Sequence, residues 1–285
     1  MLLSIGQPVL SRQIKALEEE LGAELYHRTG RGIVLTDAGR ILADHARSVI
    51  ERTERARSEI QDLGGAPSGR AVIGMPPSVG IVFTVPLVQR FRKEFPKASL
   101  VVMEGFSGHV LEWLTSGRLD VAILYNVPAI ASLLLEPLFT EELMLLGPAS
   151  DPAGVGSQVV GAQRLASLPL ILPSRPHAIR MQLDGALEKS GHAGNITLEI
   201  NAMPSTLKLV ECGFGYTILP YSCVHELVAQ QRLRAWPIQI PSMTRELMLA
   251  TTTSRPISKA ARELARMVRM EVLALEKAGA WGRHD

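Results

Sequence analysis

The chain has 285 residues, a formal net charge of +2 and 46% hydrophobic residues, which is typical of a soluble globular protein with two or three domains. The low net charge excludes a globally basic nucleic-acid or membrane binder, so any contact with DNA depends on where individual cations lie. The two cysteines, Cys212 and Cys223, are too few for a disulfide framework and predict free, inert thiols in a reducing compartment.

The N-terminal residues lack the charged and apolar regions of a secretory signal peptide. The apolar stretch 119–139 is interrupted by Asp120, Asn126, Pro128 and Glu136, so it is not expected to span a bilayer. We therefore expect a cytoplasmic protein with no membrane partner.

A helix is predicted from Pro8 to about Gly22. Proline suits the first helical turn, because its missing N–H would have no partner there. Leucine or isoleucine recurs every three or four residues from Leu10 to Leu25 and forms one apolar stripe. The opposite face begins with Gln7, Ser11, Arg12 and Lys15, whose side chains suit base edges and phosphates. The acidic run 18–20 follows and is expected to face solvent.

Two short strands, at residues 25–26 and 33–35, flank the glycine-containing sequence HRTGRG and predict a hairpin. Arg28 and Arg31 would project from it toward a DNA backbone or minor groove, as in a wing. An amphipathic helix with a solvated face, followed by an ordinary hairpin, would give the same periodicity, so the pattern alone leaves both interpretations open.

The exact amino-acid sequence of this segment distinguishes between these two interpretations. Residues 7–22 read QPVLSRQIKALEEELG and residues 25–39 read LYHRTGRGIVLTDAG. This long, ungapped sequence closely resembles the LysR-type transcriptional regulators, whose winged helix-turn-helix has this recognition helix and wing. The resemblance implies that the helix enters the major groove of promoter DNA. The expected DNA-binding residues are Gln7, Pro8, Ser11, Arg12, Lys15, Arg28, Thr29 and Arg31.

The sequence departs from the family pattern in two ways. Gly6 stands where family members usually have a serine that caps the recognition helix. Leu3 aligns with the end of the family's second helix, so the usual first helix has no counterpart in the printed sequence. We therefore expect a partial winged helix-turn-helix, with the apolar stripe of the recognition helix partly exposed.

A long helix is predicted over residues 37–63, with Thr36 as its N-cap. Small or apolar residues recur along it at alternating spacings of four and three, which makes a heptad seam. The seam residues are Leu42, Ala46, Val49, Thr53, Ala56, Ile60 and Leu63. Packing against the chain's own core remains an alternative, but the family dimerises through this helix, and we expect a dimer and a dimer of dimers.

From Arg70 onward, short apolar runs alternate with helical stretches, which favours α/β units with largely parallel sheets. The expected strands are 71–74, 99–104, 120–125, 142–146, 170–172, 196–200, 216–219 and 247–251. The expected helices are 82–94, 110–115, 179–190, 204–212 and 258–277. The family resemblance, which covers essentially the whole chain, implies a two-lobed effector domain like a periplasmic binding protein.

Polar loops follow several of these strands, where open α/β sheets bind ligands. Ser78, Ser107 and Thr206 lie near helix starts, where hydroxyl and backbone N–H groups can hold an anion. Arg175 can pair with a carboxylate. Each hydroxyl could equally be a helix cap. Together they predict an effector cavity lined by Ser78, Ser107, Tyr125, Arg175, His177, Met203 and Thr206, with a carboxylate as one suitable effector.

Enzymatic motifs are absent from the sequence: there is no HExxH, no Walker loop and no paired CxxC. His109 and His177 fall on the predicted cavity loops but have no obvious acidic partner, so neither a catalytic site, a metal site nor a cofactor is expected.

The predicted organisation is a multidomain α plus α/β chain. It comprises a partial winged helix-turn-helix (1–36), a linker and dimerisation helix (37–63), a hinge (64–69), lobe I (70–142 and 245–285) and lobe II (143–244). The predicted function is that of a LysR-type regulator that senses a small molecule between its lobes and regulates promoters. The sequence of its cavity loops most resembles the nitrogen-assimilation-control subgroup. A shortened family member that dimerises and binds ligand but reads DNA poorly remains the alternative.

Overall fold

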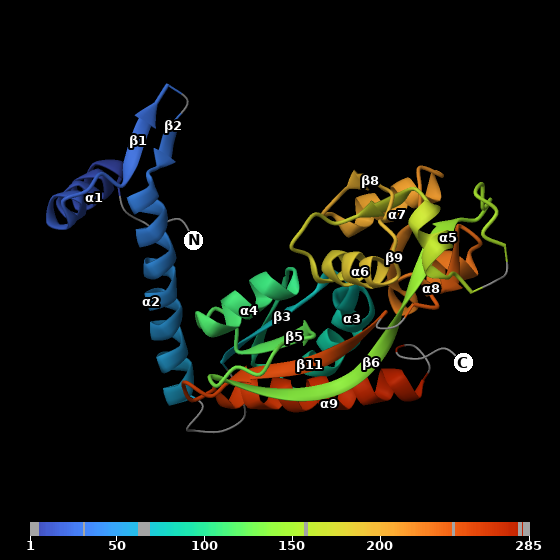
Figure 1. The fold of residues 1–285 in the computed structure, drawn as a ribbon. Coiled ribbons are helices and arrows are strands. Elements are labelled where there is room, and N and C mark those ends of the chain that lie inside the picture. Colours follow the sequence, from blue (N-terminus) through green and yellow to red (C-terminus); the bar gives the residue numbers. More distant parts are fainter. Residues whose placement is uncertain are drawn as a thin grey trace. The chain divides into compact units, whose positions relative to one another are not determined.

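The computed structural model describes residues 6–30, 32–61, 69–156, 159–240, 243–278 and 281 (Figure 1). By its internal contacts the chain divides into two compact units, Met1–Arg57 and Ser58–Asp285. We describe each unit separately. The predicted wing residue Arg31, the seam residue Leu63 and most of the predicted hinge lie outside the described residues.

The first unit contains helix α1 (Gln7–Leu21), the hairpin strands β1 (Tyr26–Thr29) and β2 (Gly32–Leu35), and helix α2, which begins at Asp37 and continues to Gln61. Gly22 ends α1 in the left-handed conformation, with φ of 65°, which glycine adopts without strain. The Thr36 hydroxyl accepts a 2.9 Å hydrogen bond from the backbone N–H of Gly39, so the predicted N-cap of α2 is confirmed.

Leu25 connects the helix, the wing and α2. Its side chain is buried, its N–H donates to Glu18 Oε1 at 2.8 Å, and its carbonyl accepts from the N–H of Thr36 at 3.1 Å. A Cβ at Gly39 would lie 1.9 Å from that carbonyl oxygen, so only glycine allows α2 to approach it. The prediction that the acidic run faces solvent is therefore wrong for Glu18, which pairs with the backbone that leads into the wing.

The second unit begins with a mixed sheet in the strand order β10–β6–β11–β5–β3–β4, with β9 also paired to β6. Its strands are β3 (Arg70–Met75), β4 (Ser99–Glu104), β5 (Val121–Tyr125), β6 (Leu133–Pro148), β9 (Thr217–Pro220), β10 (Leu233–Pro237) and β11 (Thr244–Thr252). Only β3–β4 and β3–β5 are parallel pairs, and β6 and β11 are antiparallel to all their neighbours. The expectation of largely parallel sheets is therefore wrong for this sheet.

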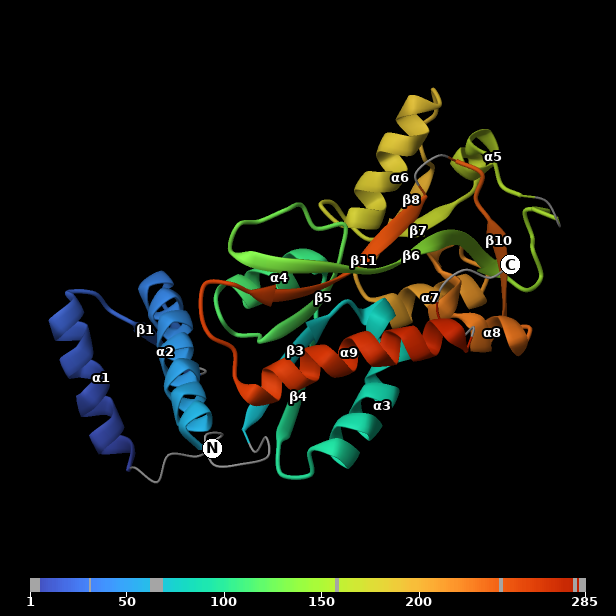
Figure 2. The same ribbon diagram turned by 90° about the horizontal axis from the view of Figure 1, so that it is seen from below.

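Helices cover both faces of the sheet in the first lobe. Alternate residues of β3 and β5 pack against α3 (Pro77–Glu94) and α9 (Lys259–Lys277), and the intervening residues pack against α4 (Ser107–Thr115). Figure 2 shows α3 and α9 side by side beneath the sheet. Burial on both faces explains why these strands read as continuous apolar runs.

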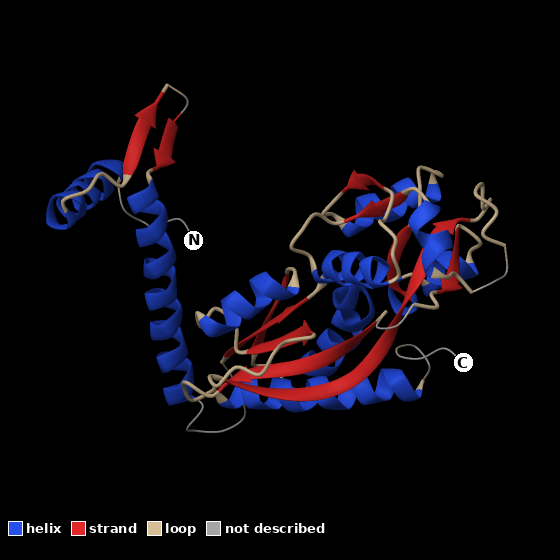
Figure 3. Ribbon diagram, in the orientation of Figure 1, coloured by secondary structure: helices blue, strands red, loops and turns tan. Residues whose placement is uncertain are grey.

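Strand β6 is shared by the two lobes. It pairs with β11 over Leu133–Glu142 and with β9 and β10 over Leu143–Pro148. Figure 3 shows β6 and β11 as two long adjacent strands. The second lobe adds the parallel pair β7 (Leu170–Leu172) and β8 (Ile196–Glu199), helices α5 (Ala162–Ser167), α6 (Ala178–Lys189), α7 (Met203–Glu211) and α8 (His225–Ala229), and the short turn η2 (Tyr221–Cys223). It has its own apolar core, centred on Leu145, Leu170 and Ile218.

The structure contains elements that sequence periodicity missed. No strand was predicted over the first half of β6, where Glu136 and Pro137 interrupt the apolar run; in the structure Glu136 forms an ion pair with Arg269 of α9 at 2.6 Å. Strand β10 was also missed, and α5, η2 and α8 are too short to show a helical period. Helix α3 starts five residues earlier than predicted, at Pro77 rather than Val82. None of the described helices has the length and apolar character needed to cross a membrane.

Candidate DNA-reading surface and effector cavity

The first two turns of α1 carry the predicted DNA-reading residues. Gln7, Pro8, Arg12 and Lys15 are exposed and Ser11 is half-buried, and Arg12 and Lys15 form no ion pair with any described residue. Gln7, Ser11 and Lys15 follow one another at a spacing of four, which places them on one helical face. The start of α1 therefore presents uncompensated cations beside amide and hydroxyl groups.

The wing, formed by strands β1 and β2, carries further predicted DNA-binding residues. Arg28 is exposed on β1 and is paired in register with Ile33 of β2. The Thr29 hydroxyl donates to the carbonyl of Gly32 at 3.1 Å, which closes the turn of the hairpin. Thr29 thus stabilises the wing itself, in addition to any contact it makes with phosphate. No residue of α1 is buried, which agrees with the expectation that its apolar stripe is partly exposed.

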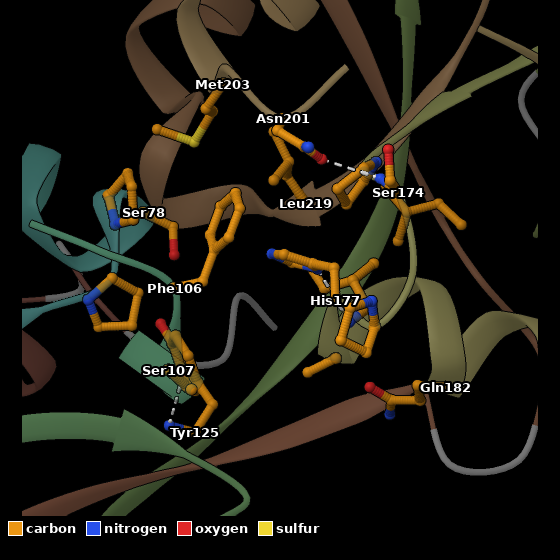
Figure 4. A pocket seen from close by; sticks show the side chains of 18 of the residues that line it. Ser78, Phe106, Ser107, Tyr125, Ser174, His177, Gln182, Asn201, Met203 and Leu219 are labelled. Carbon is orange, nitrogen blue, oxygen red and sulfur yellow. Dashed lines mark hydrogen bonds between the residues drawn. The ribbon is translucent and has the colours of Figure 1, made fainter. Parts of the chain in front are cut away.

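A cavity of about 390 Å³ lies in the second unit, between loops of the two lobes. It is lined by all the predicted effector residues: Ser78, Ser107, Tyr125, Arg175, His177, Met203 and Thr206. Figure 4 shows several of these side chains together with Phe106 and Asn201, which lie on the predicted cavity loops, and with Gln182 and Leu219, which the sequence did not suggest. Gln182 lies inside α6 and Leu219 inside β9, so no loop signal marks either residue.

The three hydroxyls expected near helix starts are not helix caps. The N-cap positions of α3, α4 and α7 are Pro76, Phe106 and Ala202, none of which provides a side-chain hydrogen bond. Ser78 instead accepts from Arg245, Ser107 accepts from the N–H of Tyr125 at 3.3 Å, and Thr206 donates to the carbonyl of Ala202 at 3.2 Å. Three helices therefore begin at the cavity without a side-chain acceptor for their first N–H groups.

His177 caps the fourth helix, α6, and faces Phe106. Its Nδ1 accepts from the N–H of Ile179 at 3.2 Å, so in the neutral ring the proton lies on Nε2. The ring meets Phe106 edge to face, with centroids 4.6 Å apart. Burial, and secondarily the charge of Arg245, lowers the pKa of His177 to about 4. The cavity therefore has a neutral imidazole at physiological pH.

This shift predicts a pH effect on stability. The pKa of His177 falls from 6.5 to about 4 on folding, so between these values the unfolded chain binds more protons. Its contribution is complete above about pH 6.5 and is lost progressively as the pH falls toward about 4. Asparagine can also cap a helix but does not titrate, so His177→Asn should lose less stability than the wild type between about pH 7 and 4.5 in urea unfolding. Equal losses would contradict this assignment.

Arg175 is less available than expected. Its Nε and Nη2 both donate to Asp184 Oδ2, at 2.8 and 2.6 Å, and its side chain is 62% exposed. Asp184 also accepts from Arg180, which in turn binds Glu199 at 2.7 Å. The carboxylate partner expected for Arg175 is thus provided by the protein itself, at the edge of the cavity.

The buried cation of the cavity is Arg245, on β11. Its Nε donates to Glu141 Oε1 at 2.7 Å and its Nη2 to Ser78 Oγ at 3.0 Å. Its guanidinium carbon lies 3.6 Å from the centre of the Tyr125 ring, a cation–π contact. The sequence prediction began this strand at Leu247 and so missed Arg245, although an arginine beside an apolar run could have attracted attention.

The cysteines and possible metal ligands provide no reactive centre in the described part of the chain. Cys223 is buried, and burial raises the pKa of its thiol to about 12, so it is a poor nucleophile. Both cysteines are free, as expected, but only Cys223 is buried; Cys212 is exposed at the end of α7. No group of three or more His, Cys, Asp or Glu side chains among these residues is arranged to hold a metal ion.

Each of the two parts of the chain matches a known protein family. Residues 2–40 match the family "Bacterial regulatory helix-turn-helix protein, lysR family", and residues 64–272 match "LysR substrate binding domain". The chain belongs to the LysR family. It is a DNA-binding transcriptional regulator with an effector-binding domain, as the sequence predicted.

Individual relatives agree with this assignment. The "Nitrogen assimilation regulatory protein nac" of Escherichia coli (strain K12) is 33% identical over 92% of this chain and 86% of its own length, which supports the expected subgroup. Full-length CbnR complexed with its target DNA has a TM-score of 0.72 at 19% identity, covering 94% of this chain and 91% of CbnR. The effector-binding domain of QuiR in complex with shikimate has a TM-score of 0.63 at 19% identity, covering 73% of this chain and 98% of that domain. The similarity to CbnR and QuiR establishes the fold.

Proposed function

We propose that this LysR-family regulator reads promoter DNA through the first two turns of α1 and the wing. The observation that carries the proposal is the exposed set Gln7, Arg12 and Lys15, whose cations have no ion-pair partner among the described residues. Unpaired arginine and lysine can bind phosphates, and arginine and glutamine can also read base edges. Arg28 and Thr29, together with Arg31 outside the described residues, would extend the contact from the wing.

The interlobe cavity would hold a small-molecule effector, and a carboxylate suits the residues that line it. Hydroxyl groups, free helix N-termini and Arg245 supply donors, while Phe106, Met203 and Leu219 supply an apolar wall. Such a cavity fits a small ligand with an apolar body and one polar end. The effector can change DNA binding only if it binds two arrangements of the domain with different affinity.

Self-association through α2 completes the proposed function. Val49 and Ile60 of the predicted seam are 62% and 69% exposed, and no described seam residue is buried. A helix with an exposed heptad seam favours a partner helix. We therefore propose a dimer, and a dimer of dimers, that reads a palindromic promoter site. The domain boundaries inferred from the sequence are part of this proposal.

A mobility-shift titration of the intact chain on its gene's own upstream region tests DNA reading. If about six phosphates are neutralised, affinity should fall on the order of 1000-fold between about 50 and 200 mM salt. No salt-sensitive shift from a properly folded chain would contradict the proposed reading surface.

The relatives are transcriptional regulators rather than enzymes. We propose that this chain likewise catalyses no reaction, because the half-buried histidine of the cavity, His177, serves as a helix cap with its Nδ1 occupied. A regulator that reads a bacterial promoter acts where the chromosome lies, so we also propose that it works in the cytoplasm.

A further inference from the structure

Beneath the effector cavity lies a buried ion pair whose partners come from two different strands. Arg245 of β11 and Glu141 of β6 are directly opposite each other in the antiparallel register. Their charged atoms are 2.7 Å apart, and their side chains are only 6% and 2% exposed. Because both groups are removed from water, each serves as the counter-ion of the other.

Only Arg245 reaches the cavity. It belongs to the cavity lining, whereas Glu141 does not. The Nε and Nη2 atoms of Arg245 are occupied by Glu141 and Ser78, while Nη1 donates to none of the described residues. The pair therefore presents to the cavity a guanidinium group with donor capacity remaining.

Glu141 is also held by two residues that do not line the cavity. Its Oε2 accepts from the indole Nε1 of Trp281 at 3.2 Å and from the Ser222 hydroxyl at 3.4 Å. Trp281 is buried against Phe83 and Phe139, with ring centroids 5.7 and 5.0 Å away. These two donors stabilise the carboxylate in its place opposite Arg245.

The rest of the cavity contains no negative charge. Among the described residues that line it there is no aspartate or glutamate. His177 is neutral and offers Nε2–H, and Arg175 is neutralised by Asp184. The N-termini of α3, α4 and α7, which have no side-chain caps, begin beside the same space. Helix N-termini favour anions, and here a buried guanidinium group provides a second, independent donor.

We propose that the cavity selects a monoanion whose charged end hydrogen-bonds to Arg245, and that Glu141 is the residue that sets this charge preference. This inference rests on the proposed effector cavity and specifies the ligand class. Glu141 already compensates one positive charge, so the bound anion shares Arg245 with it and relies on the helix N-termini for additional stabilisation. Without the Glu141 carboxylate, Arg245 would be a buried cation without a counter-ion, and an anion in the cavity would take over that role.

The test uses the full chain with two near-isosteric probes, benzoate and benzamide, and measures calorimetric binding and thermal unfolding. Wild type should prefer benzoate by roughly tenfold, because hydrogen bonds to charged groups are stronger than neutral ones. Glu141→Gln should unfold at a lower temperature, and benzoate should raise that temperature more than it does for wild type. Benzamide should not do so. Equal effects of the two probes on Glu141→Gln, including no effect of either, would overturn the proposal.

Two further variants keep the test decisive. Arg245→Met combined with Glu141→Leu removes both charges together, a change that buried pairs often tolerate, and should eliminate the preference for benzoate. A preference that persists in this double variant would overturn the proposal even if Glu141→Gln does not fold. Glu211→Gln is the matched control, because it breaks a pair with Arg232 in which neither residue lines the cavity, and it should leave the preference unchanged. None of these measurements involves DNA, so their failure is distinguishable from failure of promoter binding.

Discussion

Replacing Val49 with glutamate is expected to convert the oligomer into monomers. Val49 lies near the middle of the α2 seam and is 62% exposed in the single chain, so the substitution should not disturb the fold of its own subunit. In a symmetric dimer the new carboxylate would be buried in an apolar seam close to its own symmetry mate, which is unfavourable through both desolvation and repulsion. Sedimentation should give the mass of a single chain, and promoter binding should be lost with the dimer.

Arg47→Glu provides the control for this experiment. Arg47 lies on the same helix outside the seam, where it forms an exposed pair with Asp44. Arg47→Glu changes the net charge by two units, whereas Val49→Glu changes it by one. Because exposed ion pairs contribute little to stability, the Arg47→Glu oligomer should persist. An unchanged mass for Val49→Glu would show that the seam is not the dimer interface.

Arg12→Ala is expected to weaken promoter binding by about 1–3 kcal/mol, or roughly 5- to 150-fold in Kd. Arg12 lies in the second turn of α1, is exposed, and has no ion-pair partner among the described residues, so its truncation should cost the chain little stability. Mobility-shift titrations on the promoter and on unrelated DNA distinguish its role. A loss confined to the promoter indicates a base contact, and equal losses on both indicate a phosphate contact.

Arg92→Ala, at an exposed arginine of α3 in the effector domain, is the matched control. It removes the same charge from the chain and should leave Kd within about twofold of wild type, since substitutions at exposed sites that make no specific contact usually have small effects. If Arg12→Ala binds the promoter as tightly as Arg92→Ala does, α1 is not the reading helix.

Secondary structure was predicted well where the signal was local. Strands β4 and β7 were placed with their observed bounds, and Pro8, Thr36 and Gly22 marked the helix ends as expected. Helix α3 began earlier than predicted because Pro77 and Gly80 read as loop residues, although proline suits a first helical turn. The second half of β6 was found, but its first half was missed because Glu136 interrupts the apolar run.

The predicted effector residues all line one cavity, yet its buried cation was not among them. Strand order explains both results. The loops that follow successive strands meet at one edge of a sheet, so residues such as Ser78 and Ser107 could be grouped from sequence. Arg245 reaches the cavity from within β11, an antiparallel strand, where no loop signal marks it.

The sequence by itself determined the family, the recognition helix, the wing and the heptad seam. Each of these depends on neighbouring residues that follow a fixed spacing or a recognisable motif. Only the tertiary structure decided which polar groups remain available for a ligand. Arg175 is occupied by Asp184, whereas Arg245 is paired with Glu141 across 104 positions of sequence. Such pairings depend on strand register and on burial, which determine the charge and donor capacity of the cavity but leave no pattern in the linear sequence.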